Sequence, residues 1–168
     1  MKWNEVDRLP CSVARAQAVV GDRWTMLILR SAFLRVRRFE DFQKQIGLTR
    51  HRLADRLSRL VAQGVLEKQA YQDRPPRYEY RLTEKGMELY PVLMALVAWG
   101  DKWADEGDGP PLLFKHQRCN HEFHAVLSCS HCGEAVKPRE VTPLIGPGLR
   151  AQAQKIQAQG RRSRRKAS

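Results

Sequence analysis

The chain has 168 residues, of which 42% are hydrophobic and 29% charged, a composition typical of a folded globular protein rather than a disordered one. Its formal net charge of +12 argues against an ordinary metabolic enzyme and favours a polyanionic partner. The excess lies in two segments, since residues 35–81 carry a net +6 and residues 150–168 a net +7. No secretory signal and no apolar run of membrane-spanning length is visible, so we expect a cytoplasmic protein without a membrane partner.

Helical periodicity dominates the first hundred residues. We expect a short helix ending at Gly21, a core helix capped by Asp22, a third helix over residues 39–46 and a fourth that begins at Thr49. The third and fourth helices are joined by the short turn 47–49 with its glycine, which is the pattern of a helix-turn-helix.

Two strands and a long helix follow. Residues 65–71 and 77–82 are predicted strands, and the turn 73–76 between them contains two prolines. A hairpin after a helix-turn-helix predicts a mainly α fold with a small β-hairpin wing, a winged helix-turn-helix. Thr83 then caps an amphipathic helix, which Pro91 should kink or divide.

Five motifs carry a resemblance to a known family, at residues 11–15, 20–30, 38–42, 53–60 and 77–86. The most specific are Gly-x-x-Trp-x-x-x-Ile-Leu, which begins at Gly21, and Leu-Thr-x-Lys-Gly, which ends at Gly86. The chain resembles the HxlR family of bacterial transcriptional regulators, winged-helix proteins of the MarR type. This resemblance implies a homodimer that binds a near-palindromic operator on double-stranded DNA. We expect a repressor, although the sequence does not separate repression from activation. The chain departs from the family at Ser12, where a proline usually follows the cysteine.

A helix that enters the major groove presents polar donors at its N-terminal end, where they reach base edges. We therefore assign base contacts to the first turn of the fourth helix, and phosphate contacts to its flank, to the segment before the third helix and to the wing tip. The predicted DNA-binding residues are Arg37, Arg38, Thr49, Arg50, His51, Arg52, Arg56, Arg59, Arg74 and Arg77. The alternative is a helix whose charges only face water.

A single winged helix reads few base pairs, so we expect a symmetric dimer on two half-sites. The helix over residues 83–104 has an apolar stripe that can pair with its copy. The stripe could instead pack only within the monomer.

A second set of residues has the spacing of metal ligands. His116 and Cys119 form one x₂ pair, and Cys129 and Cys132 form another, followed by Gly133. Two such pairs suit one tetrahedral, structural zinc ion, so we expect a small zinc-ribbon-like module. A connecting hairpin could lie within residues 122–128.

Alternatives remain open for these ligands. His121, His124 and His131 compete with His116 for the first position, and the cysteines could instead be reduced thiols without metal or a redox couple. A zinc deaminase fits poorly, because Ser128 stands where its Pro-Cys-x-x-Cys motif has proline. A c-type haem site fits poorly, because Gly133 stands where its Cys-x-x-Cys-His motif has histidine.

Cys11 is a candidate redox sensor. It lies near a predicted helix start with Arg15 one turn later, two features that favour a nucleophilic thiol, and it resembles the family's N-terminal cysteine. A small buried residue is the alternative. The DNA-binding activity could thus be controlled by oxidation of this thiol, by an electrophile that reacts with it, or by another small-molecule effector.

We thus predict three parts: a winged-helix DNA-binding and dimerisation domain over 1–106, a linker with the zinc module over 107–145, and a basic tail over 146–168 that is disordered or partly helical. A regulator of transcription is the favoured function. A zinc-ribbon and winged-helix protein-interaction module without sequence-specific DNA binding is the alternative. An enzyme has least support, since no general base accompanies a ligand set.

Overall fold

The computed structural model describes residues 9–166, with 158–166 as backbone only, and they fall into two compact units. Residues 19–127 form one unit, and the other combines the described residues before 19 with those from 128 onward. The predicted boundary after residue 106 therefore lies inside the first unit. None of the described helices is long and apolar enough to cross a membrane.

Four helices come first, in the predicted order: α1 (Ser12–Val20), α2 (Thr25–Phe33), α3 (Phe39–Ile46) and α4 (Arg50–Ala62). The carboxylate of Asp22 accepts hydrogen bonds from the backbone N–H of Trp24 at 3.0 Å and of Thr25 at 3.1 Å, which confirms it as the cap of α2. Ile28 and Leu29 are fully buried, so α2 is the predicted core helix.

The turn between α3 and α4 is built as the sequence predicts. Gly47 ends α3 with a φ of +73°, a left-handed conformation that glycine adopts without strain. Thr49 occupies the N-cap position of α4, although its side chain makes no capping hydrogen bond. The apolar faces of both helices meet α2 in one core, which contains Phe42, Leu48, Leu53, Leu57 and Leu60.

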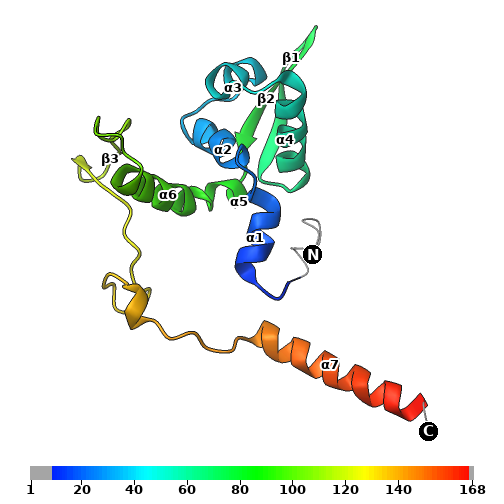
Figure 1. The fold of residues 1–168 in the computed structure, drawn as a ribbon. Helices are drawn as coiled ribbons and strands as arrows, with labels where there is room; N and C mark the ends of the chain where they lie inside the picture. Colours follow the sequence, from blue (N-terminus) through cyan, green and yellow to red (C-terminus); the bar gives the residue numbers. More distant parts are fainter. Residues whose placement is uncertain (1–8, 167–168) are drawn as a thin grey trace. The chain divides into compact units, whose positions relative to one another are not determined.

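The wing is the antiparallel hairpin of β1 (Leu66–Asp73) and β2 (Pro76–Leu82). A β-bulge interrupts its register between Ala70 and Gln72. Figure 1 shows the tip of the hairpin projecting beyond the helices of this unit. The segment before α3 joins the hairpin, because the N–H of Tyr80 donates to the carbonyl of Arg37 at 2.8 Å.

The Leu-Thr-x-Lys-Gly motif closes the C-terminal end of α4. Lys85 Nζ donates to the carbonyl of Gln63 at 2.7 Å, and the hydroxyl of Thr83 donates to the carbonyl of Gly64 at 2.6 Å. Gly86 packs so closely that a Cβ there would lie 2.2 Å from the carbonyl oxygen of Val65. We call these contacts the α4 clamp; they satisfy the backbone carbonyls of Gln63 and Gly64, directly after the last residue of α4.

Pro91 divides the predicted long helix, as expected. The structure has α5 (Glu84–Met87) and then α6 (Tyr90–Trp103), with the proline in the first turn of α6, where no backbone N–H is needed. Thr83 caps α5, since its hydroxyl accepts from the N–H of Gly86 at 3.1 Å. Leu93 and Met94 on the inner face of α6 are buried.

The second unit contains a turn flanked by a single β-bridge between Ser128 and Ala135, a 3₁₀ turn at Pro138–Glu140, and α7 (Pro147–Lys166). Of the two expectations for the tail, disordered or partly helical, the described residues up to 166 have the helical one. Ala, Gln, Arg and Lys dominate α7 and have high helix propensity, and a proline at the first position suits a helix start.

The α4 clamp leads to a stability prediction. Gly86→Ala should lower the free energy of unfolding by about 2–4 kcal/mol, because a backbone carbonyl blocks the added methyl group. Gly100→Ala is the matched control: no atom of the described residues lies within 4 Å of its Cβ position in α6, and alanine there should be neutral or stabilise by about 0.5–1 kcal/mol. Urea unfolding measures both, and equal effects would contradict the account of the clamp.

Candidate nucleic-acid interface and metal ligands

The first turn of α4 is exposed and basic. Thr49, Arg50, His51 and Arg52 all face solvent, while Leu53 begins the buried face of the helix. The guanidinium of Arg50 lies 4.8 Å from the centre of the Phe39 ring, a cation–π contact that holds it at the entrance of the helix. The structure therefore gathers the predicted base-reading residues at one helix end.

Arg56 and Arg59 are engaged elsewhere on α4. Arg56 forms an ion pair with Asp22 at 3.4 Å and a second with Asp55 at 3.7 Å. Arg59 pairs with Asp55 at 3.1 Å. The Arg56 pair links α4 to the cap of α2, so this arginine positions the helix.

A groove of about 590 Å³ runs between the wing and the N-terminal ends of α3 and α4. Basic side chains line it from each of these elements: Arg38, Arg50, Lys68 and Arg77. Glu40 and Asp41, in the first turn of α3, also line it, where the helix dipole favours acidic groups. The groove adds Lys68 to the residues predicted from the sequence.

Aromatic rings support these basic groups. The guanidinium of Arg38 lies 4.9 Å from the centre of the Tyr71 ring, and the ammonium of Lys68 lies 4.1 Å from that of Tyr78. Rings of this kind limit the freedom of long side chains while leaving their charge in solvent. Sequence reasoning missed Tyr71 and Tyr78, and their aromatic character beside basic residues was the available signal.

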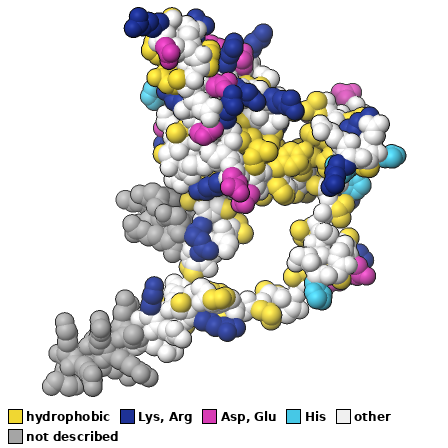
Figure 2. Space-filling view, turned by 180° about the vertical axis from the view of Figure 1, so that it is seen from behind, with side chains coloured by type: hydrophobic (Ala, Val, Ile, Leu, Met, Phe, Trp, Pro, Cys, Tyr) yellow, Lys and Arg dark blue, Asp and Glu magenta, His cyan; other side chains and the backbone are white. Residues whose placement is uncertain are grey.

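The wing tip carries the remaining predicted residues. Arg74 and Arg77 are exposed on either side of Pro75 and Pro76, and the carbonyl of Arg74 accepts from the side chain of Gln72 at 3.0 Å. Arg37 is exposed on the segment that joins the hairpin. Figure 2 shows Lys and Arg side chains gathered at the hairpin end of this unit and hydrophobic ones toward α6.

The outer face of α6 is apolar and exposed. Val92, Leu96, Trp99 and Trp103 recur at spacings of four, three and four residues, so they form one stripe, which we call the α6 stripe. Their exposed fractions range from 48% to 67%. Within the monomer, α6 packs through its other face, and the stripe has room for a partner.

The first pair of candidate metal ligands lies on a small hairpin. β3 (Lys115–His116) pairs with β4 (His121–Glu122), and His116 Nδ1 lies 3.3 Å from Cys119 Sγ. Asn120 has a φ of +63°, and its N–H donates to the carbonyl of His116 at 2.7 Å. The prediction of a hairpin within residues 122–128 is therefore wrong. The hairpin spans residues 115–122 instead, because the tight turn after His116 brings β3 and β4 together directly.

The second pair lies on a turn of the same form. Gly133 has a φ of +78°, and its N–H donates to the carbonyl of Cys129 at 2.8 Å. Hydrogen bonds from the backbone of Cys132 and His131, and from the Cys132 side chain, lower the pKa of the Cys129 thiol below its ordinary value of 9.0. A thiol of lowered pKa is a better metal ligand.

The candidate ligands are thus brought together two by two. Among residues 9–166, no group of three or more His, Cys, Asp or Glu side chains is arranged to hold a metal ion. His116 is the histidine placed against Cys119, whereas His121 lies on β4 and His131 within the second turn.

Cys11 is exposed just before α1. The backbone N–H of Arg15 donates to the carbonyl of Cys11 at 3.1 Å, while the Arg15 guanidinium donates to the hydroxyl of Ser12 at 3.1 Å. The expectation of a buried residue is therefore wrong, and the thiol is accessible.

A helix-turn-helix, a wing and a basic groove between them define a winged-helix protein of the DNA-binding class. Comparison with known proteins makes the assignment specific. Residues 19–108 match the family model described as HxlR-like helix-turn-helix, and the chain belongs to this family.

Similar proteins extend the match. The "uncharacterized HTH-type transcriptional regulator Rv3095" of Mycobacterium tuberculosis is 44% identical over 140 residues, 83% of this chain and 89% of the relative. The crystal structure of PA1607, described as a candidate transcription factor, has a TM-score of 0.75 and 31% identity and covers 83% of this chain and 98% of its own. Matches of this length continue past the end of the family model.

Structures described as the redox regulator HypR in its reduced form and as the reduced regulator YodB of Bacillus subtilis are also similar. The HypR structure has a TM-score of 0.54 and 28% sequence identity, and the match covers 56% of this chain and 95% of HypR. The YodB structure has a TM-score of 0.50 and 31% sequence identity, and the match covers 58% of this chain and 98% of YodB.

The chain is therefore a DNA-binding transcriptional regulator, of a family whose members are typically dimeric and are not enzymes. This decides against the protein-interaction module.

Proposed function

We propose that the protein represses transcription as a homodimer, with each α4 in the major groove of one half of a near-palindromic operator. The observation that carries this proposal is the exposed basic first turn of α4 beside a groove lined by Arg38, Arg50, Lys68 and Arg77. Base edges in the major groove accept hydrogen bonds from such side chains.

We divide the DNA-binding residues into those that contact base edges and those that contact phosphates. Arg50 and Arg52 reach base edges from the helix end, with Thr49 and His51 beside them. Arg37, Arg38, Lys68, Arg74 and Arg77 neutralise phosphates. We assign Arg56 to positioning α4, because its guanidinium pairs with Asp22 before α2. Arg59 pairs with Asp55 of the same helix and stays exposed, so we keep it as a phosphate contact.

The α6 stripe is the dimer contact in this proposal. Two copies of one stripe on a twofold axis bury the same apolar residues against each other, which is the geometry of a symmetric dimer. Its two tryptophans, Trp99 and Trp103, supply large apolar surfaces of the kind that dominate interface energies.

The dimer contact predicts the effect of one charge. Leu96→Glu should raise the dimer dissociation constant at least about 100-fold, because the carboxylate would be buried without a partner. Met87→Glu is the control, since Met87 is an exposed apolar residue outside the stripe and the change should leave the dimer intact. Analytical ultracentrifugation measures both, and a wild-type chain that stays monomeric at micromolar concentration would refute the dimer.

The division of work predicts two different losses of DNA binding. Arg50→Ala should relax the preference at one base position per half-site, by about 1–3 kcal/mol. Arg74→Ala should instead weaken all sequences alike and reduce the slope of log affinity against log salt by about 1 per half-site. Binding of operator and scrambled duplexes across a salt series measures this. A change of sequence preference in Arg74→Ala greater than its loss of affinity would contradict the wing assignment.

We also propose that His116, Cys119, Cys129 and Cys132 hold one structural zinc ion, as a zinc-ribbon-like module. The support is that both ligand pairs lie on turns of one form: the residue after the second ligand is left-handed, and its N–H donates to the carbonyl of the first. This conformation turns both side chains of a pair to one side, as a tetrahedral ion needs.

The donor set fits zinc by its chemistry as well. Three thiolates and one imidazole are soft and borderline ligands that zinc prefers, and the second turn already favours a thiolate at Cys129. Residues 112–145 contain many exposed apolar side chains, such as Leu113, Leu127 and Leu144, so a metal would supply stabilisation that their own burial does not.

Metal content tests this site. The purified, reduced chain should contain one zinc ion per protomer by elemental mass spectrometry, and Cys129→Ser should abolish it. Cys11→Ser should retain the metal, because this cysteine lies outside the set. His116→Ala should lose zinc while His124→Ala keeps it. Zinc retained by Cys129→Ser, or absent from the reduced wild type, would overturn the proposal.

Thiol control at Cys11 completes the proposal. The residue is exposed, and two similar structures are of proteins described by their redox state. Oxidation or an electrophile at this thiol, next to α1, would supply the signal that releases DNA.

A further inference from the structure

A pocket within the unit 19–127 has a different chemistry from the DNA-binding surface. It lies between the C-terminal half of α6 and the chain segment 110–125, with a volume of about 280 Å³. Its walls are largely apolar, and they include Met94, Val97, Leu113, Phe114 and Phe123. The volume is near the lower end for small-molecule sites, so it suits a compact ligand.

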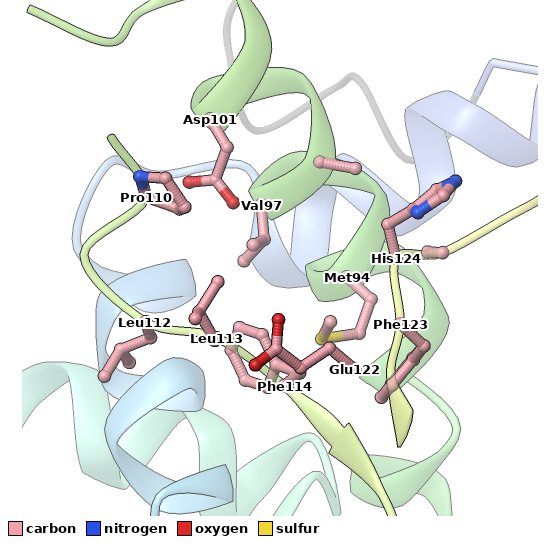
Figure 3. A pocket seen from close by; sticks show the side chains of 12 residues that line it. Met94, Val97, Asp101, Pro110, Leu112, Leu113, Phe114, Glu122, Phe123 and His124 are labelled. Carbon is pink, nitrogen blue, oxygen red and sulfur yellow. The ribbon is translucent and has the colours of Figure 1, made fainter. Parts of the chain in front are cut away.

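The ionisable groups of the pocket set its preference. They are Asp101, Glu122 and His124, and no Lys or Arg lines it among the side chains that the structure describes. Figure 3 shows the carboxylates of Asp101, from α6, and Glu122, from β4, both directed into the same space. Neither forms an ion pair with any side chain that the structure describes.

A ligand that matches this lining carries a positive charge on an apolar body. Its charge would pair with two carboxylates, and the rings of Phe114 and Phe123 attract cations through their faces. An anion would meet repulsion inside the pocket, and a hydrated metal ion would leave the apolar walls unused. We propose that this pocket binds a small organic cation, a protonated amine or a quaternary ammonium compound with an aromatic or branched apolar group.

The place of the pocket links it to regulation. A ligand there would contact the inner face of α6, whose outer face carries the proposed dimer contact, and the hairpin of the first ligand pair. Control of DNA binding by the ligand rests on the proposed function, whereas ligand binding does not. The test therefore measures binding without DNA.

The probe is benzyltrimethylammonium, titrated into the full-length, ¹⁵N-labelled, zinc-supplemented protein and followed by amide NMR shifts. Phenylacetate and benzyl alcohol are the anionic and neutral comparisons. We expect saturable shifts in α6 and residues 110–125 with a Kd of about 0.1–1 mM, and at least about tenfold weaker binding of both comparisons. A preference for the cation would oppose the protein's overall positive charge, so it must arise locally.

The variant is Asp101→Asn with Glu122→Gln, which should weaken the cation about tenfold or more. The matched control is Glu106→Gln with Asp108→Asn, two exposed acids outside the pocket that change the net charge equally and should leave the Kd unchanged. Amide spectra report whether each variant keeps its fold, and each single substitution should give a partial loss. No saturable binding, equal binding of the neutral compound, or equal loss in the control pair would overturn the proposal.

Discussion

The closure of α4 by the Leu-Thr-x-Lys-Gly motif is the constraint on which the arrangement of the DNA-reading unit depends. Lys85 and Thr83 donate to the carbonyls of Gln63 and Gly64, directly after the recognition helix, and Gly86 lets the backbone of α5 approach that of Val65. The same few residues are the exit from the wing and the entrance to α5 and α6. Recognition helix, wing and proposed dimer helix therefore share one joint, and a half-site spacing can be fixed only if this joint is stiff.

Binding of DNA depends next on how the basic side chains are held. Arg38, Arg50 and Lys68 each lie over an aromatic ring, so their charges are arranged before DNA arrives. Less side-chain entropy is then lost on binding. Arg56 has a different role, because its guanidinium forms an ion pair with Asp22 and holds α4 against the start of α2. Whether an arginine of this unit contacts DNA or positions a helix thus depends on whether its partner within the fold is an aromatic ring or a carboxylate outside its own helix.

Local signals predicted most of the fold. Gly47, Asp22 and Pro91 each act within a few residues of their own position, and the structure has the turn, cap and helix division that they indicate. Long-range contacts could not be predicted in this way. The bulge after Ala70 shifts the alternation of β1, so the place of Tyr71 beside Arg38 does not follow from strand periodicity. The ion pair of Arg56 with Asp22 likewise joins residues far apart in the sequence.

Selection of DNA from a random pool by the purified protein, at about 150 mM salt, distinguishes sequence-specific from purely electrostatic binding, because this ionic strength suppresses the latter. We expect enrichment of an inverted repeat with its half-sites about one helical turn apart, bound by two protomers. Recovery of single half-sites, or of DNA without any common sequence, by correctly folded and reduced protein would contradict it.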